Sequence, residues 1–500
     1  MKGMSHGAAT AATPSTTAAT AATAVNAVPT ETHNSPAVRV VAIVGGGFSG
    51  VSVAVQLLRQ ESHAPLRIVL FEPRAELGAG VAYATRDYPY PLNVAAGQMS
   101  LDASVPHDFL EYACAQGIRA SATDYLPRQL YGEYLRARFA AACAAAPPHL
   151  RAIHYRARVL QLRRAGDGRW DLWLDDGSAQ RADQVVLALG NAPPHAPAQL
   201  LPIASSVFAV EDPWSLGSCA HENTGSVLLL GSGLTMIDAA LRLAAIRPRV
   251  RHIHVLSRHG LLPQVQASQA HAAGKPMLAQ LLAARGSTRR LARLLRGVAD
   301  DLVDAGGDWR ELFVMLRPRL PEMWQGLDAR ERARFLRHLR AWWDVHRHRV
   351  PAGPMAAVRS LERLGVLEVH AGRLESVRTL EDAVEVQWRP RGAQRARACL
   401  VDRVVNCTGP DSHVTRHPDP LVQTLLSAGW IRPDAHGLGI DVASDGRVIA
   451  RDGRPVDRLH YIGPWLRARD WEATAVPELR VHASRLAQQL TRDLGLVTHP

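Results

Sequence analysis

Three glycines at the start of the folded part of the chain have the type and spacing of a phosphate-binding turn. They form a G-x-G-x-x-G pattern directly after the apolar run at residues 40–44, and a helix-forming stretch follows them. Glycine permits the tight turn and the close approach of backbone N–H groups, and the N-terminus of a helix attracts phosphate charge. A strand, a glycine turn and a helix in this order predict a dinucleotide site rather than a turn without a ligand. The candidate binding residues are Gly45, Gly47, Phe48, Ser49 and Gly50.

An acidic residue follows at the position where such a site uses one. A second apolar run at residues 66–71 ends at Glu72, about 20 residues after Gly50, where a carboxylate accepts hydrogen bonds from ribose hydroxyls. No basic side chain replaces this acid. The first site therefore suits the ADP half of FAD.

The same plan recurs in the middle of the chain. An apolar run at residues 227–230 is followed by a second glycine turn and a helix-forming stretch, although Met236 stands where a third glycine is usual. The next strand, at residues 253–256, ends without an acid and is followed by a serine and an arginine. A hydroxyl and a guanidinium suit a 2′-phosphate, which favours NADPH, with NADH possible. The candidate residues are Gly231, Ser232, Gly233, Leu234, Thr235, Ser257 and Arg258.

This internal repeat predicts the architecture. Both halves run through a strand, a glycine turn, a helix, a strand, a meander of short strands and an apolar strand that ends in glycine. We expect an α/β fold with two Rossmann-like dinucleotide-binding domains, the second inserted in the first, and a disordered Ala/Thr-rich tail. The expected ranges are 1–37 for the tail, 38–200 and 402–496 for the FAD domain, and 201–401 for the NAD(P)H domain with a helical insertion at about 261–354.

Composition excludes several classes of function. The 500 residues carry a formal charge of +12, but the arginines are spread along the chain, so no nucleic-acid partner is expected. No apolar stretch is long enough to span a membrane. The 5 cysteines are scattered without a C-x-x-C pair, which favours a reduced, cytoplasmic protein and argues against a disulfide reductase. His346 and His348 do not share a helix face, so no metal site is predicted.

The chain resembles the bacterial FAD/NAD(P)-binding proteins, a group that includes FAD-dependent urate hydroxylases and aspartate N-hydroxylases. The resemblance covers nearly everything from residue 38 to residue 494. It implies FAD in the first domain, NAD(P)H in the second, and oxygen insertion as the reaction of characterised members. It rests on both glycine turns and on the motifs Gly78-x-Gly80-Val81-Ala82-Tyr83, Leu92-Asn93-Val94, Pro127-Arg128-x-x-Tyr131-Gly132, Ser257-Arg258-x-Gly260-Leu261-Leu262-Pro263, Trp343-Asp344-Val345-His346-Arg347-His348-Arg349 and Trp471-Glu472-x-Thr474-Ala475-Val476-Pro477.

The resemblance also implies which residues lie along the flavin. Pro464 departs from the Gly-Asp pair that many flavoproteins of this architecture carry after their last strand, so an aspartate contact to the ribityl chain is not expected. The residues carried over are Asn93, Met99 and Arg128 beside the flavin, and Gly463, Ala473 and Thr474 near its pyrophosphate or pyrimidine end.

Two dinucleotide sites on one chain indicate electron transfer between two carriers. We expect a monooxygenase that uses molecular oxygen to hydroxylate a small polar substrate, either a urate-like ring or the amine of an amino acid. Arg128, Arg347 and Arg349 could hold an anionic substrate, or could simply be surface charge. A reductase or oxidase that serves another acceptor, and a flavin-binding regulatory protein without turnover, remain alternatives. No catalytic side chain is assigned, and the substrate and the oligomeric state stay open.

Overall fold

The structure is a computed structural model that describes residues 38–210, 212–216, 225–246, 250–267, 281–284 and 286–496. The predicted tail at residues 1–37 lies outside these residues, as does the part of the predicted insertion at residues 268–280. Everything below concerns the described residues.

A largely parallel sheet forms around the first predicted dinucleotide site. Its strands are β1 (Arg39–Val44), β2 (Leu66–Phe71), β3 (Leu150–Tyr155), β7 (Gln184–Leu187), β15 (Arg447–Ile449) and β16 (Pro455–Tyr461). Their order is β15-β16-β7-β1-β2-β3, and only β15 runs antiparallel to its neighbour. The apolar run in β1 is buried from Val41 to Val44, as expected for a central parallel strand. The predicted Rossmann-like arrangement is therefore confirmed here.

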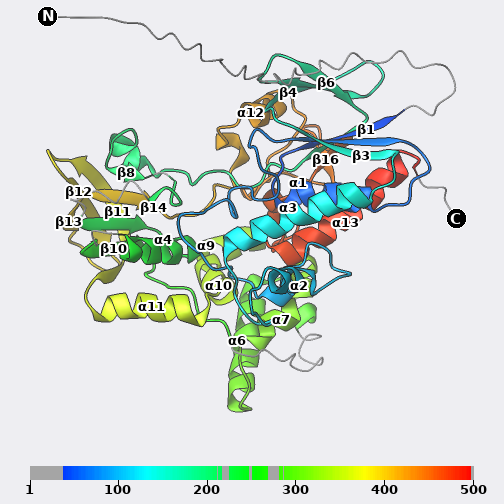
Figure 1. Ribbon diagram of the computed structural model, residues 1–500. Coiled ribbons are helices and arrows are strands. Elements are labelled where there is room, and N and C mark those ends of the chain that lie inside the picture. The colour runs from blue at the N-terminus through cyan, green and yellow to red at the C-terminus, as the bar shows by residue number, and fades with distance from the viewer. Residues whose placement is uncertain are drawn as a thin grey trace, which may run out of the picture. The chain divides into compact units, whose positions relative to one another are not determined.

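Helices cover this sheet and join its distant segments. In Figure 1, α1 (Phe48–Leu58), α3 (Arg128–Ala145) and α13 (Val476–Asp493) lie side by side, so the two ends of the described chain pack together. An antiparallel meander of β4 (Val159–Arg164), β5 (Trp170–Leu174) and β6 (Ala179–Ala182) packs against α12 (Pro420–Ser427). Shorter elements are η1 (Ala96–Gln98), α2 (Asp108–Ala115), η5 (Val414–Arg416) and η6 (Pro464–Ala468).

A second sheet contains the repeat. Its strands are β8 (Ala209–Val210), β9 (Ser226–Leu230), β10 (His252–Ser257), β11 (Leu367–Thr379), β12 (Val384–Pro390), β13 (Arg397–Val401) and β14 (Arg403–Asn406). Their order is β13-β12-β11-β10-β9-β14-β8. The long β11 pairs parallel to β10 in its first half and antiparallel to β12 in its second. One face packs against α4 (Leu234–Ala245) and α11 (Ala352–Arg363), and η2 (Ala198–Ile203) covers part of the other.

The predicted boundary at residue 402 is corrected by β14. This strand lies between β9 and β8 in the second sheet, with Val404 opposite Leu228 and Val405 opposite Leu229. Its apolar side chains are buried against those neighbours, so it cannot belong to the first sheet. The chain returns to the first sheet only after residue 406, because β14 takes the place in this repeat that β7 takes in the first.

The part of the insertion that the structure describes is helical, as predicted. It contains α6 (Thr288–Asp304), α7 (Glu311–Leu316), η4 (Arg317–Arg319), α8 (Leu320–Gln325), α9 (Ala329–His338) and α10 (Arg340–Arg347). Its apolar side chains pack on the segment that follows β16: the Trp324 ring lies 4.6 Å from the Trp471 ring, and Trp324 Nε1 donates to the Ala468 carbonyl at 3.0 Å. The insertion therefore packs on the part of the molecule that is built around the first sheet.

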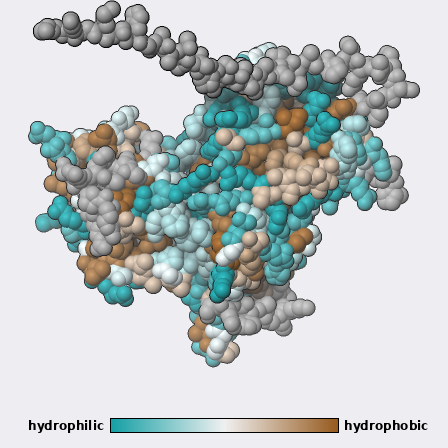
Figure 2. Space-filling view, in the orientation of Figure 1, coloured by the Kyte–Doolittle hydropathy of each residue, from teal (hydrophilic) through white to brown (hydrophobic). Residues whose placement is uncertain are grey.

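Among the described residues, the face drawn in Figure 2 shows no single large hydrophobic patch. Most of the described residues there are hydrophilic, and hydrophobic ones form separate patches among them. Large exposed apolar side chains such as Val81, Trp173 and Leu364 come from different elements, which is normal for a folded protein. Among the described helices, none is both long enough and apolar enough to cross a membrane.

A buried histidine in strand β16 of the first sheet predicts a loss of stability in acid. His460 is 1% exposed, its Nε2 lies 3.1 Å from Gln184 Oε1, and burial lowers its pKa to about 4 despite nearby Asp493 and Asp445. The unfolded chain therefore binds this proton below pH ~6.5 and the folded protein does not, which costs about 1.4 kcal/mol per pH unit down to pH ~4. Between pH 6.5 and 5, urea unfolding should show that wild type loses about 2 kcal/mol more than His460→Gln. Equal losses would contradict this role.

Candidate functional site

The first glycine turn joins β1 to α1. The physical reason why glycine is needed differs among its three glycines. Gly45 has φ +109°, and a Cβ there would lie 2.3 Å from the Ala188 carbonyl oxygen. A Cβ on Gly50 would lie 1.9 Å from the Gly45 carbonyl oxygen. Packing therefore demands these two glycines. A Cβ on Gly47 would meet only the Cα of Gly80, at an ordinary 3.5 Å.

The space in front of Gly47 is open toward the start of α1. Gly47 is the N-cap of this helix and has an extended backbone, and no side chain caps the helix. The first N–H groups of an uncapped helix are unsatisfied donors with a partial positive charge, which favours an anion. Phe48 and Ser49 form the buried first turn. The geometry therefore leaves room for a pyrophosphate at the predicted position.

Glu72 comes from the end of β2 and lies beside the same turn. Its Oε2 accepts a hydrogen bond from the Gly46 N–H at 3.0 Å, and its Oε1 accepts one from the Arg74 N–H at 3.1 Å. The residue is 8% exposed, so these bonds hold the carboxylate rigidly. Each carboxylate oxygen keeps a further lone pair for a ribose hydroxyl. The turn and the acid are thus brought together as predicted.

Buried polar atoms around α1 lack partners among the described residues. They include Tyr131 Oη, Ser52 Oγ and Arg480 Nε. The Tyr131 ring lies 6.3 Å from the Phe48 ring, and burial raises the Tyr131 pKa well above its usual value, so its hydroxyl stays a donor. Buried polar groups in folded proteins almost always have partners. These atoms therefore fit a polar cofactor that occupies this region when it is bound.

The residues carried over by resemblance occupy three different settings. Met99 is buried, and the Asn93 carbonyl accepts a hydrogen bond from Gln266 Nε2 at 3.0 Å. Gly463 has φ +145° and precedes η6, in which Pro464 takes a first-turn position that suits proline. This explains why an aspartate is absent there. Ala473 is buried and the Thr474 N–H donates to the Glu472 carbonyl, so both lie just before α13 begins. Their contacts with a flavin stay predictions.

Arg128 has a role that the sequence does not indicate. Its Nη2 donates to Asp238 Oδ2 in α4 at 2.7 Å, and its Nε donates to the Pro91 carbonyl at 3.3 Å. The guanidinium also lies 5.0 Å from the centre of the Trp214 ring. Burial raises the Asp238 pKa to about 6, although Arg128 lowers it. Arg128 therefore links the helices of the two sheets, and its predicted place beside the flavin stays a prediction.

The second glycine turn joins β9 to α4 and repeats the first. Gly231 has φ +111°, and a Cβ there would lie 2.4 Å from the Cys407 carbonyl oxygen. Gly233 is the uncapped N-cap of α4, and a Cβ there would meet nothing within 4 Å. Leu234 and Thr235 form the half-buried first turn, and Met236 is fully buried. The third glycine is unnecessary here because Met236 fills the core between α4 and the sheet.

The predicted phosphate contacts lie at the carboxyl ends of β9 and β10. The Ser232 hydroxyl is 2.8 Å from the Ser257 hydroxyl and 2.7 Å from the Leu261 carbonyl oxygen. Arg258 is exposed, and no ion-pair partner for it is found in the described part of the chain. Arg391 Nη1 lies 3.2 Å from His259 Nδ1, and burial together with Arg391 and Arg258 lowers the His259 pKa. Two arginines therefore present positive charge at this edge.

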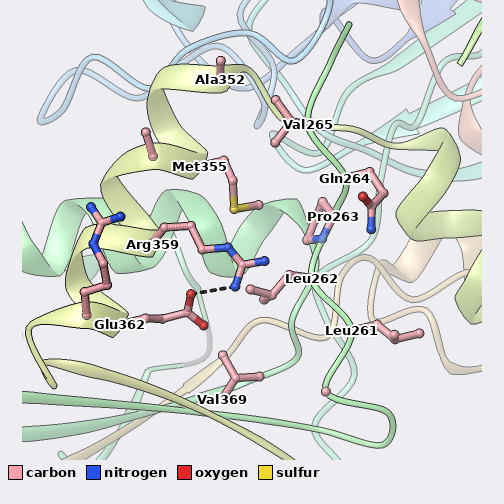
Figure 3. Close-up of a pocket in the computed structure, with 13 residues that line it drawn as sticks. Leu261, Leu262, Pro263, Gln264, Val265, Ala352, Met355, Arg359, Glu362 and Val369 are labelled. Atoms are coloured by element: carbon pink, nitrogen blue, oxygen red, sulfur yellow. Dashed lines mark hydrogen bonds and ion pairs between the residues drawn. The ribbon is translucent and has the colours of Figure 1, made fainter. Parts of the chain in front are cut away.

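A hollow of about 630 Å³ continues from this edge. Figure 3 shows it between the loop at residues 260–265 and α11, with Leu262, Met355 and Val369 on its apolar walls. Arg359 Nη1 donates to Glu362 Oε2 at 2.8 Å on one side. Its volume lies within the roughly 300–1,000 Å³ of ligand pockets. The hollow therefore adjoins the loop that follows β10, and its volume is that of a ligand site.

The histidines noted in the sequence are not brought together. His346 Nδ1 lies 2.7 Å from the Trp342 carbonyl oxygen, and the absence of a metal stays a prediction. A different group forms on one face of the second sheet, where His254 Nδ1 is 3.2 Å from His370 Nε2 and His370 Nδ1 is 3.6 Å from Glu368 Oε1. The sequence does not reveal this group, because 116 residues separate the two histidines. Their mutual hydrogen bond is sufficient to account for them.

Comparison with known proteins confirms the fold and the type of the first domain. The sequence model of a family described as FAD-NAD(P)-binding matches residues 42–192. Uncharacterised proteins of Mycobacterium bovis and Mycobacterium tuberculosis are 24% identical, with 92% of this chain and 96% of theirs covered. The predicted FAD/NAD(P)-binding character of the first glycine turn is thereby supported by sequence as well as geometry.

Solved structures share the fold over nearly the whole chain. A cadaverine monooxygenase from Erwinia amylovora, bound to FAD, has a TM-score of 0.61 at 15% identity, over 90% of this chain and 94% of that one. The reduced ornithine hydroxylase from Pseudomonas aeruginosa has 0.59 at 15%, over 92% and 100%. A bacillithiol disulfide reductase from Staphylococcus aureus has 0.53 at 13%, over 91% and 99%. The predicted α/β fold is confirmed, and its neighbours perform more than one reaction.

Proposed function

We propose that this protein is an FAD-dependent, NADPH-consuming monooxygenase that hydroxylates the amine of a small polar substrate. The observation that carries the proposal is the pair of uncapped helix N-termini, at which a Cβ on the second glycine would make one ordinary 3.5 Å contact at Gly47 and none within 4 Å at Gly233. Two such sites on one chain suit two dinucleotides that exchange electrons. The match of residues 42–192 to the FAD-NAD(P)-binding family supports FAD in the first.

The chain's own residues bind and orient the two cofactors in this proposal. FAD and NADPH, when bound, supply the redox chemistry. The start of α1 and Gly47 would hold the FAD pyrophosphate, and Glu72 would hold the adenosine ribose. Gly233 and the start of α4 would hold the second pyrophosphate, with Arg258 at the 2′-phosphate. The helical insertion docked on Trp471 would exclude water from the space between them.

The choice of an amine rests on the structural neighbours. They include an ornithine hydroxylase, a cadaverine monooxygenase and an L-lysine 6-monooxygenase. A urate-like ring has no counterpart among them, so ring hydroxylation becomes one arm of the test. Because the identities are 15% and 17%, the amine assignment is a proposal for this chain.

Electron transfer to another acceptor is the second candidate, since disulfide reductases share the fold. Such an enzyme needs two neighbouring thiols. The described cysteines Cys114, Cys143, Cys399 and Cys407 form no disulfide and no C-x-x-C pair. Their spacing therefore favours the monooxygenase over a disulfide reductase.

The test measures substrate-dependent NADPH oxidation together with isotope incorporation. Purified yellow protein should bleach quickly with NADPH in the absence of oxygen, which a regulatory protein without turnover would not do. Under ¹⁸O₂, one labelled atom should appear in a hydroxylated amine at close to one product per NADPH. If urate takes up label and amines do not, the amine assignment is wrong. If neither does, while a soluble dye is reduced quickly, the reductase replaces the monooxygenase.

The preference for NADPH gives a prediction at Arg258. Loss of a charge-assisted hydrogen bond to the 2′-phosphate should weaken NADPH binding by about 1.5–3 kcal/mol, a factor of roughly 10–150. Arg258→Ala should raise KM for NADPH by that factor in stopped-flow flavin reduction and leave NADH nearly unchanged. Arg363→Ala, which alters an arginine that lines the neighbouring hollow, is the control. Equal weakening of both nucleotides would remove Arg258 from the phosphate site.

A further inference from the structure

The positively charged side chain of Arg349 is buried between the helical insertion and the loop around Asn93. Arg349 follows the end of α10 and is 8% exposed. The adjacent Val350 pairs with Val265 through a β-bridge, so the backbone on both sides is fixed. The guanidinium lies over aromatic rings, 5.8 Å from the centre of Phe313 and 6.0 Å from that of Trp309. The side chain is therefore held in place and removed from solvent.

The hydrogen bonds of Arg349 are incomplete. Its Nε donates to Gln266 Oε1 at 3.1 Å, whereas its buried Nη1 has no partner among the described residues. Gln266 in turn donates through Nε2 to the Asn93 carbonyl at 3.0 Å. Gln266 therefore connects Arg349 through two hydrogen bonds to the loop that the resemblance places along the flavin. An unsatisfied guanidinium N–H in such a place is costly unless a ligand accepts from it.

The charge around Arg349 is also unbalanced. Nearby Arg310 is paired with Asp308 at 3.0 Å, and Arg347 lies 3.2 Å from the buried Glu472. These two acids therefore each have a cation, whereas Arg349 has no ion-pair partner among the described residues. Burial, Arg347 and Arg310 all disfavour its positive charge and lower its pKa to about 10. A buried cation without a partner predicts an anionic ligand.

Of the three arginines that the sequence offers for an anionic substrate, the structure singles out one. Arg128 is hydrogen-bonded to Asp238. Arg347 lies 3.2 Å from Glu472 Oε2, although its buried Nε and Nη2 make no hydrogen bond among the described residues. Of the three, Arg349 is the one without an ion-pair partner in the described part of the chain. We propose that Arg349 anchors a carboxylate-binding subsite of the substrate pocket, so that the substrate carries a carboxylate as well as the amine to be hydroxylated. This inference rests on the proposed function for the amine, but the subsite itself rests on Arg349, Gln266 and the charge balance. A planar carboxylate suits the guanidinium fork.

The cofactors do not account for this charge in the proposed arrangement. Their pyrophosphates are placed at the starts of α1 and α4, and the 2′-phosphate at Arg258. A diamine such as cadaverine would leave the surplus positive charge of Arg349 unpaired and would add more. The subsite therefore selects amino acids over the diamines that result from their decarboxylation.

The test compares ligands that differ only in the carboxylate. Titration of FAD-loaded protein with L-lysine against cadaverine, and L-ornithine against putrescine, is followed by the flavin difference spectrum and by calorimetry without NADPH. Wild type should bind the carboxylated member at least tenfold more tightly. Arg349→Met should abolish that preference and leave the diamine unchanged. Arg310→Met, which removes a neighbouring cation that is already paired, should keep the preference.

The remaining outcomes are also decisive. Absence of a carboxylate preference in wild type, including failure of both members to bind, overturns the subsite. The same holds if Arg349→Met folds and keeps the preference. If Arg349→Met does not fold, Arg349→Lys decides, because loss of the fork should weaken only the carboxylated ligand. Binding that depends on Arg349 without amine hydroxylation would uphold the subsite and reject only the proposed reaction.

Discussion

Gly47→Val is expected to give a folded protein that no longer retains FAD. A Cβ at this position has only an ordinary 3.5 Å contact with the Cα of Gly80, so the free protein accommodates a side chain. The valine methyl groups would instead fill the space in front of α1 that we assign to the pyrophosphate. Loss of two charge-assisted hydrogen bonds corresponds to about 3–6 kcal/mol, on the order of a 100-fold or greater loss of affinity.

The measurement is the ratio of FAD to protein after purification, together with the melting temperature of the apoprotein. Gly297→Val is the control, because its Cβ would meet nothing within 4 Å and the residue lies in α6 of the helical insertion, outside both glycine turns. Gly50→Ala is the opposite control, since its Cβ would lie 1.9 Å from the Gly45 carbonyl oxygen and should destabilise the fold itself. Full flavin content in Gly47→Val would move the FAD site elsewhere.

The features that the sequence reveals are those with a local signature. The β1 strand, the Gly45–Gly50 turn and Glu72 can be predicted because a buried parallel strand, a turn that needs positive φ and a strand-end acid each leave a pattern within about 30 residues. The repeat then carries the same reasoning to Gly231 and Gly233. The structure places both glycine turns and Glu72 at these strand ends because each is set by backbone geometry close by, and their contacts with cofactors stay predictions.

Features that depend on distant segments escape the sequence. The repeat pattern includes the apolar strand at residues 403–406, but only its pairing with β9 fixes its place in the second sheet. Asp238 and Arg128 are 110 residues apart, and each alone reads as an ordinary helix residue. The same applies to Arg349, whose significance is its missing partner. Burial and charge balance are properties of the assembled fold, which a pattern along the chain does not contain.

The buried pair of Arg128 and Asp238 yields the second large prediction. Their side chains are 14% and 8% exposed, and the pair joins α3 to α4. Arg128→Met should lower the free energy of unfolding by about 3–5 kcal/mol at pH 7.5, because it leaves a buried carboxylate without its cation. Urea unfolding, followed by circular dichroism, measures the loss. Cation–π contact with Trp214 adds to it only modestly, by about 0.5–2 kcal/mol.

The pH dependence identifies the cause of that loss. Burial raises the Asp238 pKa to about 6 even with Arg128 present, so removal of Arg128 should raise it further. An aspartate whose folded pKa exceeds its unfolded value binds a proton on folding, and its ionisation destabilises the protein as pH rises through that value. The difference between wild type and Arg128→Met should therefore be largest above pH 7 and shrink toward pH 5.

A second substitution separates charge from packing. Adding Asp238→Asn to Arg128→Met removes the stranded carboxylate, so the double variant should recover most of the stability lost at pH 7.5 and show no change in this difference between pH 5 and 8. A double-mutant cycle at pH 7.5 should give a coupling energy of about 1–3 kcal/mol for the pair. If Arg128→Met is equally destabilised at every pH, and Asp238→Asn restores nothing, Arg128 stabilises the junction between the two sheets through its packing on Trp214 and not through its charge.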